Sequence, residues 1–208
     1  MNQPLWAAAS FSARMDGNCA RFLEVLALAE GAENIDRIDL NAYTFGPCGP
    51  CEYACTKGRA CTLEDDFAAL RERLFAAQRV LFALPAYDGR FPARFYTFLE
   101  RIGPYLHRDT EKKAFYDRLG LILVACRAHG GTALARTAVA LFKEAGATPR
   151  VLLISAQDCG LNALRDDLAA HDALRADAEK FITAWDEWPG EKHPGHPAFF
   201  TVHAGHRK

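Results

Sequence analysis

The sequence lacks the features that define several large classes of protein. Its formal net charge is −1 at pH 7 and no cluster of Lys and Arg stands out, which argues against nucleic-acid binding. No apolar run approaches the roughly 20 residues of a membrane-spanning helix. No basic segment followed by an apolar stretch opens the chain, so no secretory signal is visible. We therefore expect a cytoplasmic protein that binds neither nucleic acid nor membrane.

Two common nucleotide-binding fingerprints are also missing, G-x-G-x-x-G and the Walker pattern that ends in G-K-[ST]. Length and composition still allow a substantial fold, because 208 residues, half of them hydrophobic, can bury a sizeable core in one domain. We place this domain at residues 1–186 and treat residues 187–208 as a C-terminal tail. The tail contains four irregularly spaced histidines, which suits a mobile or subunit-wrapping arm, or a poorly ordered end, better than a metal site.

Segments typical of strands alternate with segments typical of helices along the chain. The strand candidates are residues 5–9, 34–40, 79–84, 119–126 and 151–155. Five strands alternating with five helices predict a parallel sheet covered on both faces, with right-handed crossovers. Ligands in such folds bind beyond the carboxyl ends of the strands. We expect the site in three loops that leave such ends, beginning at Ser10, Pro85 and Cys126.

The first of these loops, residues 10–19, has the layout of an anion-binding site. It follows an apolar run and precedes a helical pattern, so a helix N-terminus should face it. The first N–H groups of a helix have no intrahelical partner and carry partial positive charge. Ser12, Asn18 and the guanidinium of Arg14 can add donors. The loop therefore suits one phosphate, as on a mononucleotide, without a metal.

Three blocks of sequence at these loops resemble one known family. Residues 12–19, Ser-Ala-Arg-Met-Asp-Gly-Asn-Cys, are similar to an S-P-R-x-x-G-N-T phosphate loop, with Cys19 where Thr or Ser is usual. Residues 85–89 and 98–101 are similar to P-x-Y-x-G and F-L-D/E-R, and residues 127–131 resemble a glycine-rich third loop. In this order, the blocks resemble the flavodoxin-fold NAD(P)H-dependent FMN reductases, a family that includes the iron–sulfur flavoproteins.

The resemblance implies an α/β fold, a flavodoxin-like doubly wound five-stranded parallel sheet with helices on both faces. It implies an FMN-dependent NAD(P)H oxidoreductase that passes electrons to a quinone, a flavin or another small acceptor, assembled as a homodimer or homotetramer. No side chain is assigned as catalytic acid or base, because the cofactor carries the chemistry. The residues implied to bind FMN are Ser12, Arg14, Gly17, Asn18, Cys19, Pro85, Ala86, Tyr87, Asp88, Gly89, Cys126, Arg127, His129 and Gly130.

Two other functions stay open. The first is an electron carrier that serves protein partners without a nicotinamide site. Carriers of the flavodoxin type are usually strongly acidic, so the nearly neutral charge favours the enzyme. The second is a flavodoxin-fold module that has lost its flavin. Cys19 and the non-glycine start of the third loop, Ala125-Cys126, keep that alternative open.

A crowded group of cysteines lies between the first two loops. Cys48, Cys51, Cys55 and Cys61 are spaced C-x2-C-x3-C-x5-C, and soft thiolates this close suit a [4Fe–4S] cluster or, less well, zinc. Iron–sulfur flavoproteins carry a compact four-cysteine motif before an Asp-Asp helix start, and residues 65–66 are similar to that start. Compared with that motif, this chain has one extra residue between its second and third cysteines. The alternative is a set of free structural or redox-active thiols.

Overall fold

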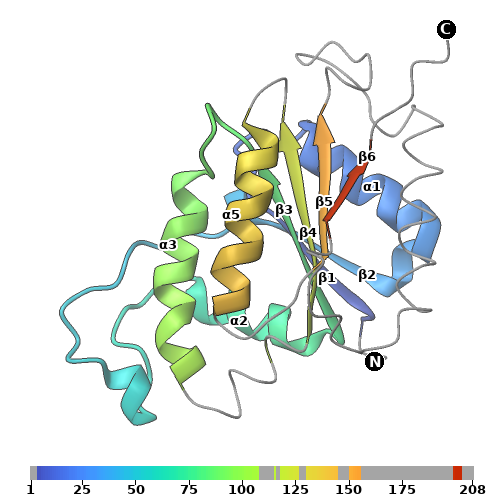
Figure 1. Cartoon of the computed structure of the whole chain (residues 1–208). Coiled ribbons are helices and arrows are strands. Elements are labelled where there is room, and N and C mark those ends of the chain that lie inside the picture. The colour runs from blue at the N-terminus through green and yellow to red at the C-terminus, as the bar shows by residue number, and fades with distance from the viewer. Residues whose placement is uncertain are drawn as a thin grey trace, which may run out of the picture.

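The computed structural model describes residues 4–107, 115, 118–126, 130–144, 150–155 and 199–202. Figure 1 shows a twisted sheet with α3 and α5 on one side and α1 on the other. The strands are β1 (Trp6–Ser10), β2 (Ile35–Asp39), β3 (Arg79–Pro85), β4 (Leu119–Cys126), β5 (Arg150–Ser155) and β6 (Phe199–Val202). The α-helices are α1 (Asn18–Glu30), α2 (Phe67–Ala76), α3 (Ala93–Ile102) and α5 (Gly131–Glu144), and short 3-10 turns are η1 (Ala32–Asn34), η2 (Leu40–Ala42), η3 (Ala54–Lys57) and η4 (Gly103–His107).

The sheet is parallel throughout and its strand order is β2-β1-β3-β4-β5-β6. The chain winds outward from β1 in both directions, so the order reverses beside β1. Ser10 at the end of β1 pairs with Asp39 of β2 and with Ala83 of β3. The loops that follow these three strands therefore leave the same edge of the sheet.

The parallel sheet with helices on both faces confirms the expected class, but the number of strands differs. The described residues form six strands instead of five, because residues 199–202 of the tail pair with β5. A run of four residues beside many Pro, Gly and His is too short to show a strand period in the sequence. The final helix expected after residue 155 lies outside the described residues.

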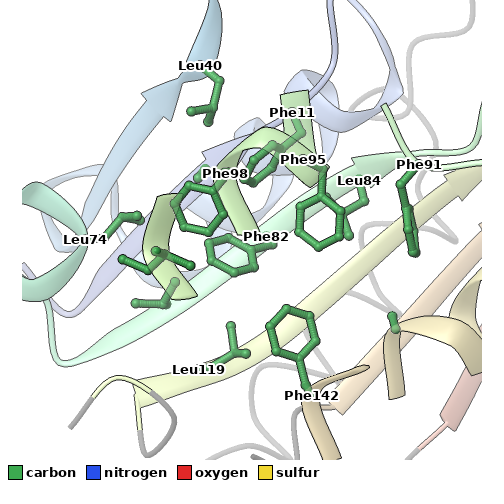
Figure 2. Close-up of a cluster of buried hydrophobic side chains, with 14 of the residues drawn as sticks. Phe11, Leu40, Leu74, Phe82, Leu84, Phe91, Phe95, Phe98, Leu119 and Phe142 are labelled. Atoms are coloured by element: carbon green, nitrogen blue, oxygen red, sulfur yellow. The ribbon is translucent and has the colours of Figure 1, made fainter. Parts of the chain in front are cut away.

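The core on the α3 side is built largely from phenylalanine rings. Phe82 comes from β3, Phe95 and Phe98 from α3, and Phe142 from α5 (Figure 2). Phe11, the first residue after β1, packs edge-on against Phe82, Phe95 and Phe98 with ring centroids 5.4, 5.2 and 5.4 Å apart. Edge-to-face ring pairs stabilise a core beyond the area that they bury. The loop that leaves β1 is thus anchored in the interior.

The helices of the described part are short. None of them is long and apolar enough to cross a membrane.

Candidate functional site

The first loop is held by its own backbone and by Ser12. Phe11 N donates to the Ala83 carbonyl oxygen of β3 at 3.0 Å, which ties the start of the loop to the sheet. Ser12 is 3% exposed, and its Oγ accepts from Arg14 N at 3.1 Å, while its own N–H reaches Ser10 Oγ at 3.4 Å. These contacts curl the chain into a tight turn at the carboxyl end of β1. The side chain of Arg14 stays exposed at its rim.

The turn ends at the N-terminus of α1, where Gly17 is the N-cap. Gly17 has no side chain to cap the helix, and Arg21 N donates to the Gly17 oxygen at 3.1 Å as the first helical bond. The N–H groups of residues 18–20 are left without intrahelical partners, and the first turn contains no acidic residue. A Cβ at Gly17 would lie 3.3 Å from both Ser12 Oγ and Arg14 Cβ. Small size and free amides are the features that an anion site needs, and we call this turn the cradle.

Cys19 lies in the first turn of α1, but its thiol faces the interior. The residue is 1% exposed, and burial raises the pKa of the thiol to about 12. A buried neutral thiol packs like a small apolar group. Any contact from Cys19 to a phosphate would therefore come from its backbone N–H. The replacement of the usual hydroxyl leaves the cradle of amides intact.

The second loop makes a tight hairpin after β3. Tyr87 and Arg90 exchange two backbone hydrogen bonds of 2.9 Å, and the two central residues, Asp88 and Gly89, have φ angles of 50° and 70°. Positive φ at both central positions is the type I′ turn, for which Asp-Gly is a preferred sequence. Tyr87 is 38% exposed, and its hydroxyl lies 3.5 Å from Ser12 Oγ. The first and second loops therefore meet at these two hydroxyl groups.

The third loop closes against the second through two glycines. Gly130 has a φ of +82°, and a Cβ built on it would lie 2.7 Å from Gly89 Cα. No real side chain tolerates that distance, so the close approach requires glycine at position 130, whereas a Cβ on Gly89 would meet nothing within 4 Å. Cys126 ends β4, whereas Arg127 and His129 lie outside the described residues. The structure thus brings together residues 12–19, 85–89 and 130, all at the carboxyl edge of the sheet.

The cysteine segment, residues 45–61, lies beside the C-terminal part of α3. Cys48 Sγ donates to the Glu100 carbonyl oxygen at 3.6 Å, and Cys61 Sγ lies 3.8 Å from Arg101 Nη2, which donates to it. Desolvation raises the pKa of the Cys48 thiol, the charge of Glu100 raises it further and Arg101 opposes both. A protonated Cys48 is consistent with its role as a donor.

Arg101 is the buried charge that fixes this segment. Its side chain is 2% exposed and pairs with Asp65. Nη2 donates to Asp65 Oδ1 at 2.9 Å, Nη1 donates to the Gly46 oxygen at 2.9 Å, and the guanidinium lies 4.6 Å from the centre of the Phe67 ring. The hydrogen bond from Arg101 holds the pKa of Asp65 below its ordinary range. No local sequence pattern predicts this role, because Arg101 lies 36 residues from Asp65.

The four cysteines have the chemistry of a soft-metal site, but the structure does not assemble them into one. Within the described ranges, no three His, Cys, Asp or Glu side chains are grouped to hold a metal ion. Cys55 is buried, Cys51 and Cys61 are half-buried, and Cys48 is exposed, and none of the four is half of a disulfide. Cys48 and Cys61 bond to different partners on α3. A metal cluster would require these sulfur atoms to move toward a common centre.

Comparison with known proteins agrees with this geometry. The family profile described as NADPH-dependent FMN reductase matches residues 8–158. A curated "Iron-sulfur flavoprotein" from Archaeoglobus fulgidus is 27% identical over 103 residues, which are 49% of this chain and 46% of that protein. The chain therefore matches less than half the length of this relative.

Solved structures share the fold at low sequence identity. An azoreductase from Bacillus anthracis superposes with a TM-score of 0.57 and 17% identity, covering 88% of this chain and 99% of that one. An NAD(P)H:quinone oxidoreductase from Methanothermobacter marburgensis superposes with a TM-score of 0.54 and 15% identity, covering 85% of this chain and 96% of that one.

The parallel fold and the three loops at one sheet edge are those of a flavodoxin-like protein, with the cradle at α1. The match over most of the chain identifies the family, and the protein belongs to the NADPH-dependent FMN reductases.

Proposed function

We propose that the protein oxidises NAD(P)H and reduces a quinone, a free flavin or another small acceptor. The observation that carries this proposal is the meeting of the first, second and third loops at one sheet edge. Bound FMN would supply the two-electron chemistry there. The chain would supply a binding site, an orientation for the ring and access for small molecules.

Each loop has its own part in this proposal. Residues 12–19 would hold the phosphate through the free amides of α1, with Ser12, Arg14 and Asn18 as further donors. Residues 85–89 would form a wall of the ring slot, with Tyr87 as its aromatic surface. Gly130 would let the third loop approach the ring edge, and Cys126, Arg127 and His129 are proposed as its neighbours.

Reduction by the nicotinamide tests the enzyme directly. Purified protein loaded with FMN should lose its flavin absorbance on mixing with NADH or NADPH in the absence of oxygen. Addition of a quinone or free flavin should restore the absorbance through many cycles. Reduction by dithionite, but by neither nicotinamide, would favour an electron carrier that serves protein partners. The nucleotide that reduces the flavin faster, NADH or NADPH, would be identified as the preferred reductant.

An iron–sulfur cluster on Cys48, Cys51, Cys55 and Cys61 is a second candidate. The four-cysteine spacing and the Archaeoglobus relative favour it, while the separate partners of Cys48 and Cys61 oppose it. α3 begins just after the second loop and carries Glu100 and Arg101 near its other end. The ten residues of α3 span about 15 Å at 1.5 Å per residue. The cysteines and the proposed site of the flavin ring therefore lie near opposite ends of this helix within one chain.

Anaerobic reconstitution with iron and sulfide tests the cluster. A bound [4Fe–4S] group would add broad absorbance beyond the flavin bands and roughly four irons per chain. Cys55→Ser should then remove the iron and leave FMN bound. Protein that carries a full complement of FMN but no iron under these conditions would leave the cysteines as free thiols. Sedimentation of the same sample would test the proposed homodimer or homotetramer.

A further inference from the structure

We propose that Asn41 is the positioning residue of the phosphate loop and that it gives the site much of its preference for a phosphorylated flavin. The inference rests on the proposed FMN site and extends it to a residue outside all three motif blocks. Asn41 lies in η2, the turn that follows β2. Its Nδ2 donates to the Ser12 carbonyl oxygen at 2.9 Å, across 29 residues of sequence. The loop after β2 thus holds the backbone of the loop after β1.

Asp39 fixes the side chain of Asn41. Asp39 Oδ1 accepts from Asn41 N and from Asn41 Nδ2, both at 2.9 Å. Hydrogen bonds to a carboxylate are stronger than those between neutral groups, so the carboxamide has one preferred orientation. Asp39 also ends β2 in register with Ser10, which sets the two loops beside each other. The sheet, the carboxylate and the carboxamide therefore together support Ser12.

The direction of the Ser12 carbonyl determines the direction of the next N–H. The described residues contain no cis peptide bond, so the Ser12 carbonyl and the Ala13 N–H point in opposite directions. With the carbonyl held toward Asn41, the Ala13 N–H faces away from the loop after β2. In the part of the chain that the structure describes, this N–H has no recorded protein acceptor. We infer that it is available to an anion in the cradle, as a donor that the proline of the S-P-R pattern lacks.

Loss of Asn41 would act on the phosphate more than on the ring. A released Ser12 carbonyl can rotate, which withdraws the Ala13 N–H and can turn a negative carbonyl oxygen toward the anion. The Oγ of Ser12 keeps its bond from Arg14 N, so the loop remains formed but is less ordered. A site that must order itself on binding loses affinity. Riboflavin, which has the ring but no phosphate, should be insensitive to this change.

The experiment compares FMN with riboflavin on the flavin-free full chain. Dissociation constants for both are measured in the wild type, Asn41→Ala and Asn41→Asp, which is nearly isosteric but cannot donate. A single hydrogen bond corresponds to about 0.5–1.5 kcal/mol, so we expect FMN to bind about 2- to 13-fold more weakly in Asn41→Ala. Riboflavin binding should stay within about twofold, and the ³¹P resonance of bound FMN should shift in both variants.

Asn34 provides a matched control. Its Nδ2 also donates to a backbone carbonyl, that of Glu30, at 2.7 Å, but at the opposite end of β2. Asn34→Ala should leave the ratio of the two dissociation constants unchanged even if the protein becomes less stable.

The outcomes distinguish the proposed phosphate site from the proposed role of Asn41. A wild type that binds FMN no better than riboflavin would overturn the phosphate site, and the role of Asn41 with it. A wild type that prefers FMN, with Asn41→Ala and Asn41→Asp keeping the same preference, would overturn the role of Asn41 alone. Equal weakening of FMN and riboflavin would show a general structural role and would also overturn it.

Discussion

Gly130 and Gly89 touch backbone to backbone, and a Cβ on Gly130 would lie 2.7 Å from Gly89 Cα. We expect Gly130→Ala to push the third loop off the second and to strain a backbone with a φ of +82°. The substitution should destabilise the fold by more than about 1 kcal/mol and weaken flavin binding. Urea unfolding and flavin titration measure the two effects.

Gly103 provides the control for this substitution. A Cβ there would meet nothing within 4 Å, and its φ of −49° is helical. Gly103→Ala should therefore cost little beyond the crowding of its Cβ against the ring of the following Pro104, and clearly less than Gly130→Ala. If the two substitutions lowered the free energy of unfolding and the flavin affinity equally, the result would contradict the close approach of the second and third loops.

The double variant Arg14→Ala with Asn18→Ala should lose FMN. It removes the two side chains that we propose as donors beside the free amides of α1. Hydrogen bonds to charged groups are worth about 1.5–3 kcal/mol each when buried and less when exposed, so we expect FMN to bind at least about tenfold more weakly. Met15→Ala changes a residue of the same loop that is 77% exposed and should have no effect. An unchanged flavin content in the folded double variant would count against this phosphate site.

Asp65→Asn should destabilise the protein at neutral pH. Removing one partner of a buried ion pair costs about 3–5 kcal/mol, and we expect the lower end because Asp65 is 17% exposed. Urea unfolding at pH 7 measures the loss. Glu24→Gln provides the control, since the Arg21–Glu24 pair is 36% and 37% exposed and should contribute less than about 1 kcal/mol.

The same pair predicts a pH dependence. The pKa of Asp65 is lower in the folded chain than its ordinary value, so its stabilisation is complete above the unfolded pKa of about 4. It is lost as the pH falls through the folded pKa, because protonation then breaks the pair. Asp65→Asn should accordingly show a shallower loss of stability in acid than the wild type. Parallel acid profiles would contradict the assignment.

Phe11→Ala should unfold the first loop together with the core. The ring contacts Phe82, Phe95 and Phe98, and removal of a buried phenylalanine costs about 3–5 kcal/mol. Tyr96→Ala, which changes an aromatic residue of α3 that is 48% exposed, should stay within about 0.5 kcal/mol. Similar midpoints for the two variants in thermal unfolding would show that Phe11 is not an anchor.

The sequence predicts best what is local. The strand, the short polar loop and the helix of residues 6–30 adjoin one another, so these three elements could be predicted from spacing alone. The hairpin at Asp88-Gly89 is likewise a short-range signal. Contacts between distant segments gave no such signal, because Asn41 reaches Ser12 across 29 residues and Arg101 reaches Asp65 across 36. Both depend on which strands and helices become neighbours.

The cysteines show why spacing alone does not establish a metal site. Four thiols within 14 residues predict convergence on one centre, yet Cys48 and Cys61 bond to Glu100 and Arg101 of α3. Their arrangement depends on a helix that follows them by about 40 residues. The buried guanidinium of Arg101 provides a positive charge that can hold this segment against α3 without a metal.

The pairing of β6 with β5 has a consequence for handling the protein. Phe199–Val202 pair with the backbone of β5 along one edge of that strand. The residues of β5, Arg150–Ser155, are mostly apolar. A chain shortened at residue 198 would replace the four-residue edge strand β6 by the six-residue strand β5, whose backbone N–H and C=O groups would then be ready to pair with another molecule. Open apolar edges are templates for self-association. We expect the shortened protein to precipitate or to form irregular oligomers at concentrations where the full chain stays dispersed, which light scattering would detect.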